Sequence, residues 1–242
     1  MPNPRVSIIF PFYNCEKFIK EALYSIEYLK SDDFEIVAVN DGSTDNSLEY
    51  AQEALRRFSI DSTLISRNRR QGCFSARIAA IKVARGQYIA LADADDVNLE
   101  GRLEKQLEIL ENDIYVMACG GWAEKIDQDG KSIGLMDYTP QNNEELINKI
   151  KSDPTCNPFI DPTMMCRKEL FYCLDGYSSD GDKNLVADMD FWFRALKRGF
   201  KFHNIPEVLI KYRINPEGNT QSHKKEMIRQ HIVVRNEFIK GI

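Results

Sequence analysis

The chain has 242 residues, of which 43% are hydrophobic and 29% charged, and its formal net charge at pH 7 is −5. This length and composition predict a globular protein with a full hydrophobic core and exclude a disordered chain. No apolar run approaches the roughly 20 residues that span a bilayer, and the N-terminus lacks the pattern of a signal peptide, so we expect a cytoplasmic protein. The six cysteines form no CxxC pair and have no histidine at zinc spacing, which argues against a disulfide framework and a zinc site.

Charge is unevenly distributed along the chain. Residues 194–242 contain 11 Lys and Arg against 4 Asp and Glu, a net charge of +7, which leaves −12 for residues 1–193. A basic segment of this kind is most often a solvated face, but it also suits an anionic acceptor or an anionic membrane surface. We therefore expect peripheral association with the inner face of the cell membrane as one outcome, and no nucleic-acid partner.

The first half of the chain alternates between predicted strands and predicted helices. Pro11–Asn14 ends the first strand, and Gly42 allows a tight turn before Ser43 or Thr44, either of which can cap the next helix. The alternation predicts a parallel sheet with right-handed crossovers, whose ligands bind beyond the carboxyl ends of the strands. Strands are predicted at 5–10, 34–39, 62–66 and 88–92, and helices at 16–29, 48–58, 75–84 and 99–110.

Three carboxylates, Asp93, Asp95 and Asp96, directly follow the predicted strand at 88–92. Carboxylates at the end of a buried strand are costly unless a cation or hydrogen-bond donors hold them. Strand alternation directs Asp93 and Asp95 to the same side, whereas Asp96 points elsewhere and can cap the helix at 99–110. A solvated turn is the commoner origin of such clusters, but we interpret Asp93-Ala-Asp95 as a metal site. It is not an EF-hand, because Val97 and the residue after it break that pattern.

The second half shows fewer motifs. The chain has no Gly-x-Gly-x-x-Gly after its first strand and no Walker A loop, which disfavours dinucleotide oxidoreductases and P-loop enzymes. No linker stands out, so this half is expected to pack on the first. We predict a hairpin at 114–126 with a turn at 129–130, helices at 144–150, 168–174, 188–198 and 225–239, strands at 163–166 and 208–212, a loop at 154–162 and a mobile loop at 175–183.

Five segments resemble motifs of the family 2 glycosyltransferases with the GT-A fold. The resemblance implies an α/β fold, with a Rossmann-like, mostly parallel sheet flanked by helices and a smaller C-terminal acceptor-side region packed on it. It further implies that residues 1–113 are the nucleotide-sugar-binding half, and residues 114–242 the acceptor-binding half and basic C-terminal helix, of one continuous domain. The segments occur in the family's order and spacing: Val6–Asn14, Val39–Asp45, Gly86–Asp96, Asp161–Thr163 and Asp188–Trp192.

The same resemblance assigns the nucleotide-binding residues. Tyr13 is implied to pack on the base, Asp41 to accept a hydrogen bond from the base's ring N–H, and Pro11 to form part of the same wall. Arg77 matches a family arginine near the base and phosphates. Taken singly, these residues are also compatible with a core aromatic, a helix cap, a strand terminator and a solvated arginine.

The metal site and its surroundings follow from the resemblance as well. Asp95 is implied to bind Mn²⁺ or Mg²⁺ directly, and Asp93 to contact the ribose and the metal; hard oxygen ligands suit both ions. Such a cation stabilises the leaving diphosphate as a Lewis acid. Arg213 is expected on the acceptor or diphosphate side. Asn215 stands where many members have a histidine, and Asn215, or less readily His223, could substitute for it.

Inversion at the sugar requires a general base on the face opposite the leaving diphosphate. Asp188 matches the family's base and is our candidate, with Asp190 as the weaker one. Trp192 walls the acceptor site or belongs to the core, where a buried Trp is more frequent. Ala187 replaces the family's usual Glu beside the base.

The resemblance thus predicts an inverting glycosyltransferase that moves a sugar from a nucleotide-diphosphate sugar, usually a UDP-sugar, to a hydroxyl of a surface polysaccharide or glycoconjugate. The acceptor would be a glycan or a lipid-linked molecule. Two alternatives remain open. One is a catalytically inactive nucleotide-sugar binding module, which Ala187 and Asn215 make conceivable. The other is a sugar nucleotidyltransferase, although its Gly-rich loop after the first strand is absent.

Overall fold

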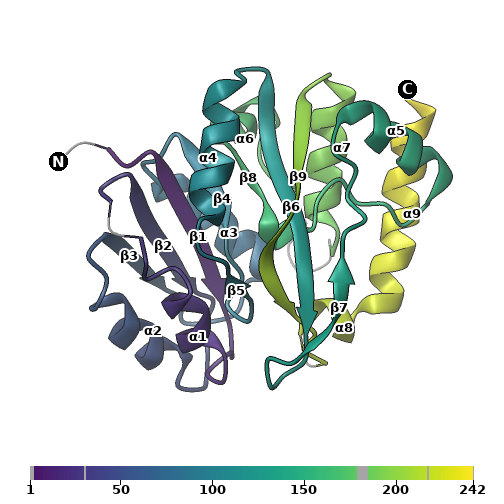
Figure 1. Cartoon of the computed structure of the whole chain (residues 1–242). Helices are drawn as coiled ribbons and strands as arrows, with labels where there is room; N and C mark the ends of the chain where they lie inside the picture. Colours follow the sequence, from purple (N-terminus) through teal and green to yellow (C-terminus); the bar gives the residue numbers. More distant parts are fainter. Residues whose placement is uncertain (1–2, 30, 179–184, 217, 242) are drawn as a thin grey trace.

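The chain folds around one mixed sheet, seen in a computed structural model that describes residues 3–29, 31–178, 185–216 and 218–241 (Figure 1). Within the described residues nine strands join in the order β3-β2-β1-β4-β8-β6-β9-β5, and β7 pairs with β6. The strands are β1 Val6–Phe12, β2 Phe34–Asn40, β3 Asp61–Ser66, β4 Tyr88–Leu91, β5 Val97–Asn98, β6 Val116–Ile126, β7 Ser132–Met136, β8 Met165–Arg167 and β9 Lys201–Arg213.

The N-terminal half of the sheet is parallel, as predicted. Strand β1 pairs in parallel with β2 and β4, and β2 pairs in parallel with β3. Every residue of β1 and β2 is buried, because helices cover both faces and such strands tolerate few polar residues. The connecting helices are α1 Ile19–Tyr24, α2 Ser47–Leu55, α3 Cys73–Val83 and α4 Arg102–Asn112.

The C-terminal half makes the sheet mixed. Strand β8 is antiparallel to both β4 and β6, and β9 is parallel to β6 and antiparallel to β5. The predicted hairpin is confirmed by the antiparallel pairing of β6 with β7. The remaining helical elements are α5 Asn143–Ser152, the 3₁₀ turn η1 Asp161–Thr163, α6 Glu169–Cys173, α7 Ala187–Lys197, α8 Asn219–Ser222 and α9 Lys224–Lys240.

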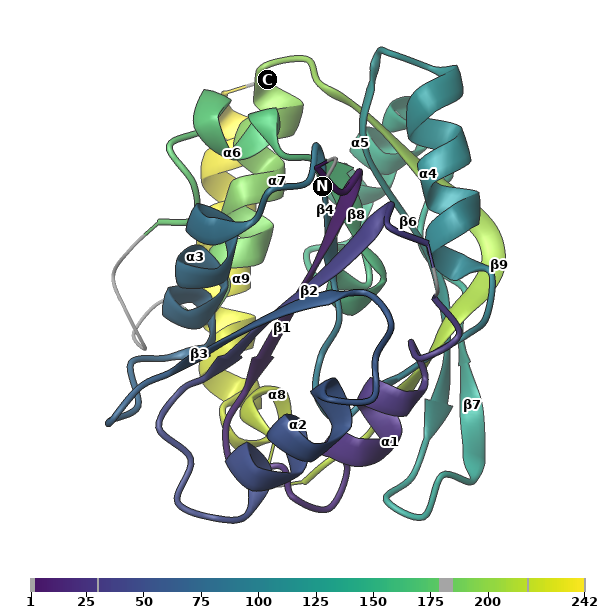
Figure 2. The ribbon, with the colours of Figure 1, turned by 90° about the vertical axis from the view of Figure 1, so that its left-hand side faces the viewer.

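Helices pack against the two faces of the sheet and divide the core into layers. Residues of α3, α5, α6, α7 and α9 form one buried cluster with one face of the sheet. Residues of α1, α2 and α4 form a second cluster with the other face. Figure 2 shows the group α3, α6, α7 and α9 on one side of the sheet and α4 on the other. Among the helices of the described residues, none combines the length and apolar character needed to cross a bilayer.

Strand β1 extends past the predicted break at Pro11. The oxygen of Ile9 accepts from Ala92 N at 3.0 Å, on the β4 side, and the oxygen of Phe12 accepts from Asp41 N at 2.9 Å, on the β2 side. Strand alternation therefore turns Pro11 toward the β4 side, where β4 has already ended at Leu91. A proline fits there because no ladder hydrogen bond is lost.

The prediction that Asp96 caps a helix is wrong. Strand β5 follows Asp96 directly, and α4 begins only at Arg102, after Gly101 at φ +81°. Asp96 is buried, and its Oδ1 accepts from Arg213 N at 2.8 Å. It therefore joins the end of β4 to β9, a contact between residues that are far apart in the sequence.

Ser43 and Thr44 do not cap α2 either, because that helix begins after Asn46. Instead, Asn14 N donates to Ser43 Oγ at 3.1 Å, and Thr44 N donates to Asn14 Oδ1 at 2.8 Å. These bonds tie the loop after β1 to the loop after β2.

Several predicted bounds also change. Helix α1 is much shorter than the predicted helix at 16–29, and β9 is far longer than the predicted strand at 208–212. The first part of β9 is rich in polar residues and contains a proline, so its strand character depends on pairing with β6 rather than on local pattern. Most of the mobile loop predicted at 175–183 lies outside the described residues.

Candidate active site

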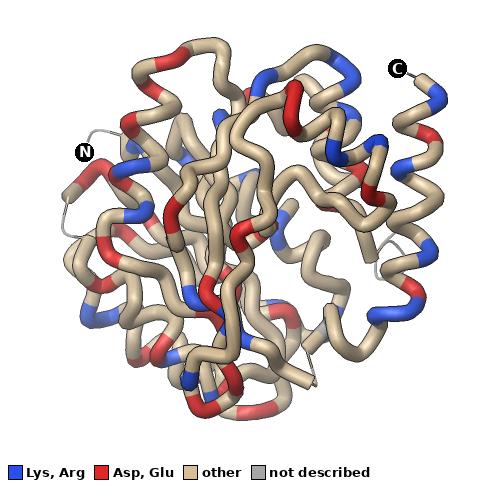
Figure 3. The backbone as a smooth tube through the Cα atoms, turned by 45° about the vertical axis from the view of Figure 1, so that its right-hand side comes forward, with Lys and Arg blue, Asp and Glu red and all other residues tan. Residues whose placement is uncertain are grey.

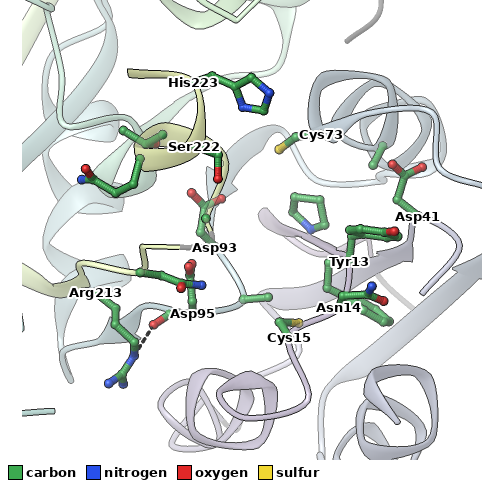
Figure 4. Close-up of a pocket in the computed structure, with 18 of the residues that line it drawn as sticks. Tyr13, Asn14, Cys15, Asp41, Cys73, Asp93, Asp95, Arg213, Ser222 and His223 are labelled. Carbon is green, nitrogen blue, oxygen red and sulfur yellow. Dashed lines mark hydrogen bonds between the residues drawn. The ribbon is translucent and has the colours of Figure 1, made fainter. Parts of the chain in front are cut away.

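A cavity of about 460 Å³ opens at the carboxyl ends of β1, β2 and β4 (Figure 4). It gathers seven of the residues singled out in the sequence. Arg77, Asp188, Asp190 and Trp192 do not line it. The lining includes Pro11, Tyr13, Asp41, Asp93, Asp95, Arg213 and Asn215, together with Asn14, Arg70, Cys73, Ser222 and His223.

One end of the cavity pairs an open aromatic ring with a fixed carboxylate. Tyr13 is 36% exposed, and the Arg70 guanidinium lies 4.8 Å from the centroid of its ring. Asp41 is buried and accepts from Gly72 N at 2.7 Å and from Arg67 Nη1 at 2.7 Å. These bonds hold Asp41 to the loop that precedes α3, so it is not the cap of α2. An aromatic face beside an oriented acceptor is suited to a planar heterocyclic base.

Close packing of two loops fixes that end. Gly42 has φ +79°, and a Cβ added to it would lie 2.5 Å from the carbonyl carbon of Arg69. Any larger residue would therefore meet both backbone strain and a backbone clash. Gly42 keeps the loop after β2 against the basic loop that carries Arg67 and Arg70. The sequence marked this loop as basic but gave it no role.

The other end of the cavity is acidic. Burial raises the pKa of Asp95 to about 6, the negative charge of Asp93 raises it further, and a hydrogen bond with the Asn215 side chain lowers it. Burial also raises the pKa of Asp96 well above its usual value, with added repulsion from Asp95. The wall around Asp93 and Asp95 therefore holds negative charge at an electrostatic cost.

Arg213 supports this wall rather than reaching into the cavity. Its Nε donates to the backbone oxygen of Asp95 at 2.8 Å, and its Nη2 donates to Glu21 Oε2 at 2.6 Å (Figure 4). Its Nη1 donates to the backbone oxygens of Asp127 at 3.0 Å and Gln128 at 3.1 Å. Because all three nitrogens are engaged and the side chain is 1% exposed, the expectation of a diphosphate contact is wrong. Arg213 positions Asp95.

The donor set at the acidic end suits a hard divalent cation. Asp93 and Asp95 supply carboxylate oxygens to one cavity, and a cation between them would relieve the repulsion that raises the pKa of Asp95. Within the described residues, no group of three or more His, Cys, Asp or Glu side chains is arranged to hold a metal ion. A metal at this wall would thus take its remaining ligands from a substrate or water, as Mg²⁺ and Mn²⁺ commonly do.

Arg77 lies behind the acidic wall and is only 3% exposed, so it is not a solvated helix arginine. Its Nη2 donates to Asp93 Oδ1 at 2.9 Å, and its Nη1 donates to Asp161 Oδ2 at 2.5 Å. The guanidinium also lies over the Phe74 ring, 5.5 Å from its centroid. Arg77 thus acts on the cavity through Asp93.

Of the three candidates on α7, only Asp188 keeps a chemical role. Burial raises the pKa of Asp188 to about 7, and the neighbouring charge of Asp161 raises it further. Asn157 Nδ2 is 3.4 Å from Asp188 Oδ2. Asp190 pairs instead with Arg194 at 2.9 Å. Trp192 is fully buried in the core, the second of the two places considered for it, and therefore does not wall an acceptor site.

The cavity residues that sequence reasoning missed come mainly from the C-terminal segment. Thr220, Gln221 and Ser222 of α8 line the cavity beside His223. Helix α8 has only four residues and carries no motif, so no signal in the sequence pointed to it. Arg70 and Cys73 flank the glycine that binds Asp41, and the basic loop was the available signal for them.

Comparison with known proteins places this site in a family. The family model described as Glycosyl transferase family 2 matches residues 7–175, which is more than half of the chain. The chain belongs to glycosyl transferase family 2. It is similar to an uncharacterized glycosyltransferase of Methanocaldococcus jannaschii, MJ1057, with 30% identity over 98% of this chain and 81% of the relative. As a member of that family it is a glycosyltransferase, and the GT-A expectation is confirmed.

Two further likenesses are informative. The glycosyltransferase of Escherichia coli named UDP-Glc:alpha-D-GlcNAc-diphosphoundecaprenol beta-1,3-glucosyltransferase WfaP is 26% identical over 98% of this chain and 88% of its own length. The mannosyltransferase PcManGT of Pyrobaculum calidifontis, solved in complex with GDP-Man and Mn²⁺, has a TM-score of 0.70 at 21% identity. That alignment covers 99% of this chain but 65% of the solved one, so the chain spans about two thirds of PcManGT. At this identity the likeness shows the fold alone.

Proposed function

We propose that this family 2 glycosyltransferase transfers a sugar, with inversion, from a UDP-sugar to a hydroxyl of a polysaccharide or another glycoconjugate. The observation that carries the proposal is the polarity of the cavity, with Tyr13 and Asp41 at one end and Asp93 and Asp95 at the other. A nucleoside diphosphate has the same polarity, because a planar base is joined through ribose to phosphates that need a cation. The printed name of the E. coli relative gives UDP-Glc, which supports UDP as the carrier.

The residues of the first two loops bind the nucleoside. Tyr13 packs on the base, and Pro11 continues the same wall. Asp41 accepts from the ring N–H of the base; its bonds to Arg67 and Gly72 N keep the carboxylate oriented before the ligand arrives. Such preorganisation lowers the entropic cost of binding.

Asp95, together with Asp93, would hold Mn²⁺ or Mg²⁺. When bound, that ion supplies Lewis-acid stabilisation of the negative charge on the departing diphosphate. The Mn²⁺ in the solved complex of PcManGT supports the choice of metal. Asn215 takes the place of the family's usual histidine, since it bonds to Asp95, whereas His223 lies on the cavity rim.

Asp188 is the general base that takes the proton from the acceptor hydroxyl as the hydroxyl attacks the sugar. A base is most effective when its pKa is close to the working pH, and burial places that of Asp188 at about 7. Inversion follows from attack on the face opposite the diphosphate, and Asp188 serves the acceptor on that face.

The acceptor is proposed to be lipid-linked, at an anionic membrane surface. The printed name of WfaP describes an acceptor on diphosphoundecaprenol. Helix α9 begins directly after the cavity residue His223 and carries exposed basic residues along its length (Figure 3). It also exposes Ile228 at 41%, Ile232 at 38% and Val233 at 57%. Exposed apolar side chains beside lysines and arginines are typical of helices that lie on anionic lipid.

Vesicle co-sedimentation tests the membrane part. We expect binding to vesicles that contain phosphatidylglycerol, loss of binding with Ile228→Ser combined with Ile232→Ser, and weakening by salt. The matched control is Val83→Ser, which removes an equally exposed apolar residue from α3. Equal absence of binding at low and high salt would contradict a membrane role for α9.

A thermal-shift series with UDP, GDP and their sugars, with and without Mn²⁺, tests the donor site. We expect UDP-sugars to stabilise the protein only when Mn²⁺ is present, because binding to the folded state raises the melting temperature. Protection by GDP alone would reassign the base, and protection by neither nucleotide would refute the site. The product's anomeric configuration, read by NMR, tests inversion.

The two other candidates differ in their products. A binding module would show protection by UDP-sugars without transfer or hydrolysis. A nucleotidyltransferase would release pyrophosphate from UTP and a sugar phosphate, which the proposed reaction does not.

A further inference from the structure

A buried chain of charges joins the donor side of the site to the acceptor side. Arg77 on α3 bonds to Asp93, at the end of β4, and to Asp161, in the η1 turn. Asp161 in turn lies close enough to Asp188 on α7 to be the main charge acting on it. Asp161 falls within a segment that resembles the family's motifs, but that resemblance gives it no role.

We propose that Asp161 is a positioning residue with two functions: it holds Arg77 against Asp93, and it places a second negative charge beside the general base Asp188. The inference rests on the proposed function in that it takes Asp188 as the base. It adds a residue that touches neither nucleotide nor acceptor and acts through its neighbours.

The first function follows from burial. A guanidinium that is 3% exposed requires compensating charge, and one carboxylate would leave Arg77 free to turn toward Asp93 alone. Asp161 is 14% exposed and Asp93 29% exposed, so the two carboxylates hold Arg77 from the inner and the cavity side. Arg77 is thereby fixed between them, and the orientation of Asp93 in the cavity is fixed with it.

The second function depends on every charged group that faces Asp188. Asp161 raises the pKa of Asp188, whereas Arg77 and the Asn157 amide lower it. Tyr177, after α6, is also near, but burial raises the pKa of its hydroxyl far above neutrality, so it stays uncharged. On its own helix, Asp190 is neutralised by Arg194. The net effect near pH 7 is that of Asp161, opposed by Arg77.

The consequence is a base that holds its proton at neutral pH more readily than an isolated carboxylate. A base with a higher pKa takes a proton from a sugar hydroxyl more strongly once it is ionised. Asp161 therefore exchanges a smaller ionised fraction for a stronger base. Removing its charge should ionise Asp188 at lower pH and weaken it as a base.

The experiment is a ¹³C NMR titration of the Asp188 side-chain carboxyl in the protein without donor or metal, compared with the pH profile of kcat/KM. In Asp161→Asn we expect both midpoints to move toward acid by about one pH unit, the size typical of a nearby like charge. Asp161→Glu keeps the charge and should retain most of the wild-type midpoint. The control Asp190→Asn should leave the midpoint in place.

The outcomes separate this inference from the proposed function. If Asp161→Asn lowers activity equally at all pH values and leaves the NMR midpoint unchanged, Asp161 is merely structural and the inference is wrong. If the NMR midpoint moves but Asp188→Asn remains active, the electrostatic link stands and the assignment of the base is wrong. Unchanged melting temperatures establish that the variants fold.

Discussion

The two ends of the parallel strands treat buried carboxylates in opposite ways. At the amino end, Glu35 accepts from Ser7 Oγ at 2.5 Å, from Arg85 N at 2.6 Å and from Arg85 Nε at 2.8 Å. Gly86 N donates to Ser7 Oγ at 2.8 Å and closes the network. Glu35 is 2% exposed, yet its charge is fully bonded within the protein. This end of the sheet is complete without a ligand.

At the carboxyl end the carboxylates repel one another instead. Burial and neighbouring charge raise the pKa values of Asp95, Asp96 and Asp188. Such unrelieved charge at a cavity is characteristic of sites that bind cations or move protons. The difference teaches that burial alone does not mark a functional carboxylate; what marks it is burial without enough internal donors.

The largest effect is expected at the carboxyl end. Asp188→Asn should lower kcat by about 10³-fold, because general-base catalysis contributes on that order. UDP affinity measured by calorimetry should stay within twofold, since Asp188 does not line the cavity. A variant that keeps more than a tenth of the wild-type rate would exclude Asp188 as the base.

At the amino end the corresponding change should affect stability alone. Glu35→Ala leaves Ser7 and the Arg85 amide without their acceptor, which should lower the free energy of unfolding by about 2–3 kcal/mol. Urea denaturation measures this, and the kcat of the folded fraction should not change. The control is the exposed carboxylate Glu53, whose replacement by Ala should cost less than about 0.5 kcal/mol. Equal losses in both variants would contradict the comparison.

The pH dependence sharpens the contrast for Asp188. Its pKa is about 7 in the folded state against 3.8 as the ordinary value, so the folded state binds the proton more tightly. This contribution to stability is present below pH 4 and is lost as pH rises toward 7, whereas kcat/KM should rise about tenfold from pH 6 to pH 8. Opposite slopes of melting temperature and activity, the first reduced in Asp188→Asn, are the expected result.

The smallest effect concerns the acidic wall. Asp95→Asn removes a charge that Asp93 repels, so without divalent cation at pH 7 the melting temperature should rise by a few degrees, about 1 kcal/mol for a chain of this size. The same variant should lose the protection that UDP and Mn²⁺ give together. A lower melting temperature without cation would show that Asp95 is held by internal donors, like Glu35.

The sequence predicted the donor side well because local signals carry it. Tyr13, Asp41, Asp93 and Asp95 each directly follow a strand with a clear apolar pattern, and parallel strands bring their carboxyl ends to one edge. The edge therefore followed from four short segments, without knowledge of side-chain contacts.

Contacts between distant segments were beyond such signals. Arg77 reads as a solvated helix residue until Asp161, 84 positions later, is seen to pair with it. Asp96 reads as a cap until Arg213, 117 positions later, donates to it. A single sequence shows which residues have the right chemistry, but burial decides which of them must be paired, and burial depends on the whole fold.

The bonds of Arg213 also set the order in which the site can form during synthesis. This side chain, near the end of β9, holds the backbone of Asp95 and the carboxylate of Glu21, 192 positions before it. A growing chain can complete the first parallel strands early, but its cation-binding loop is not held in place until β9 has left the ribosome. The unfinished protein is therefore kept from engaging its donor while most of the acceptor half is still missing.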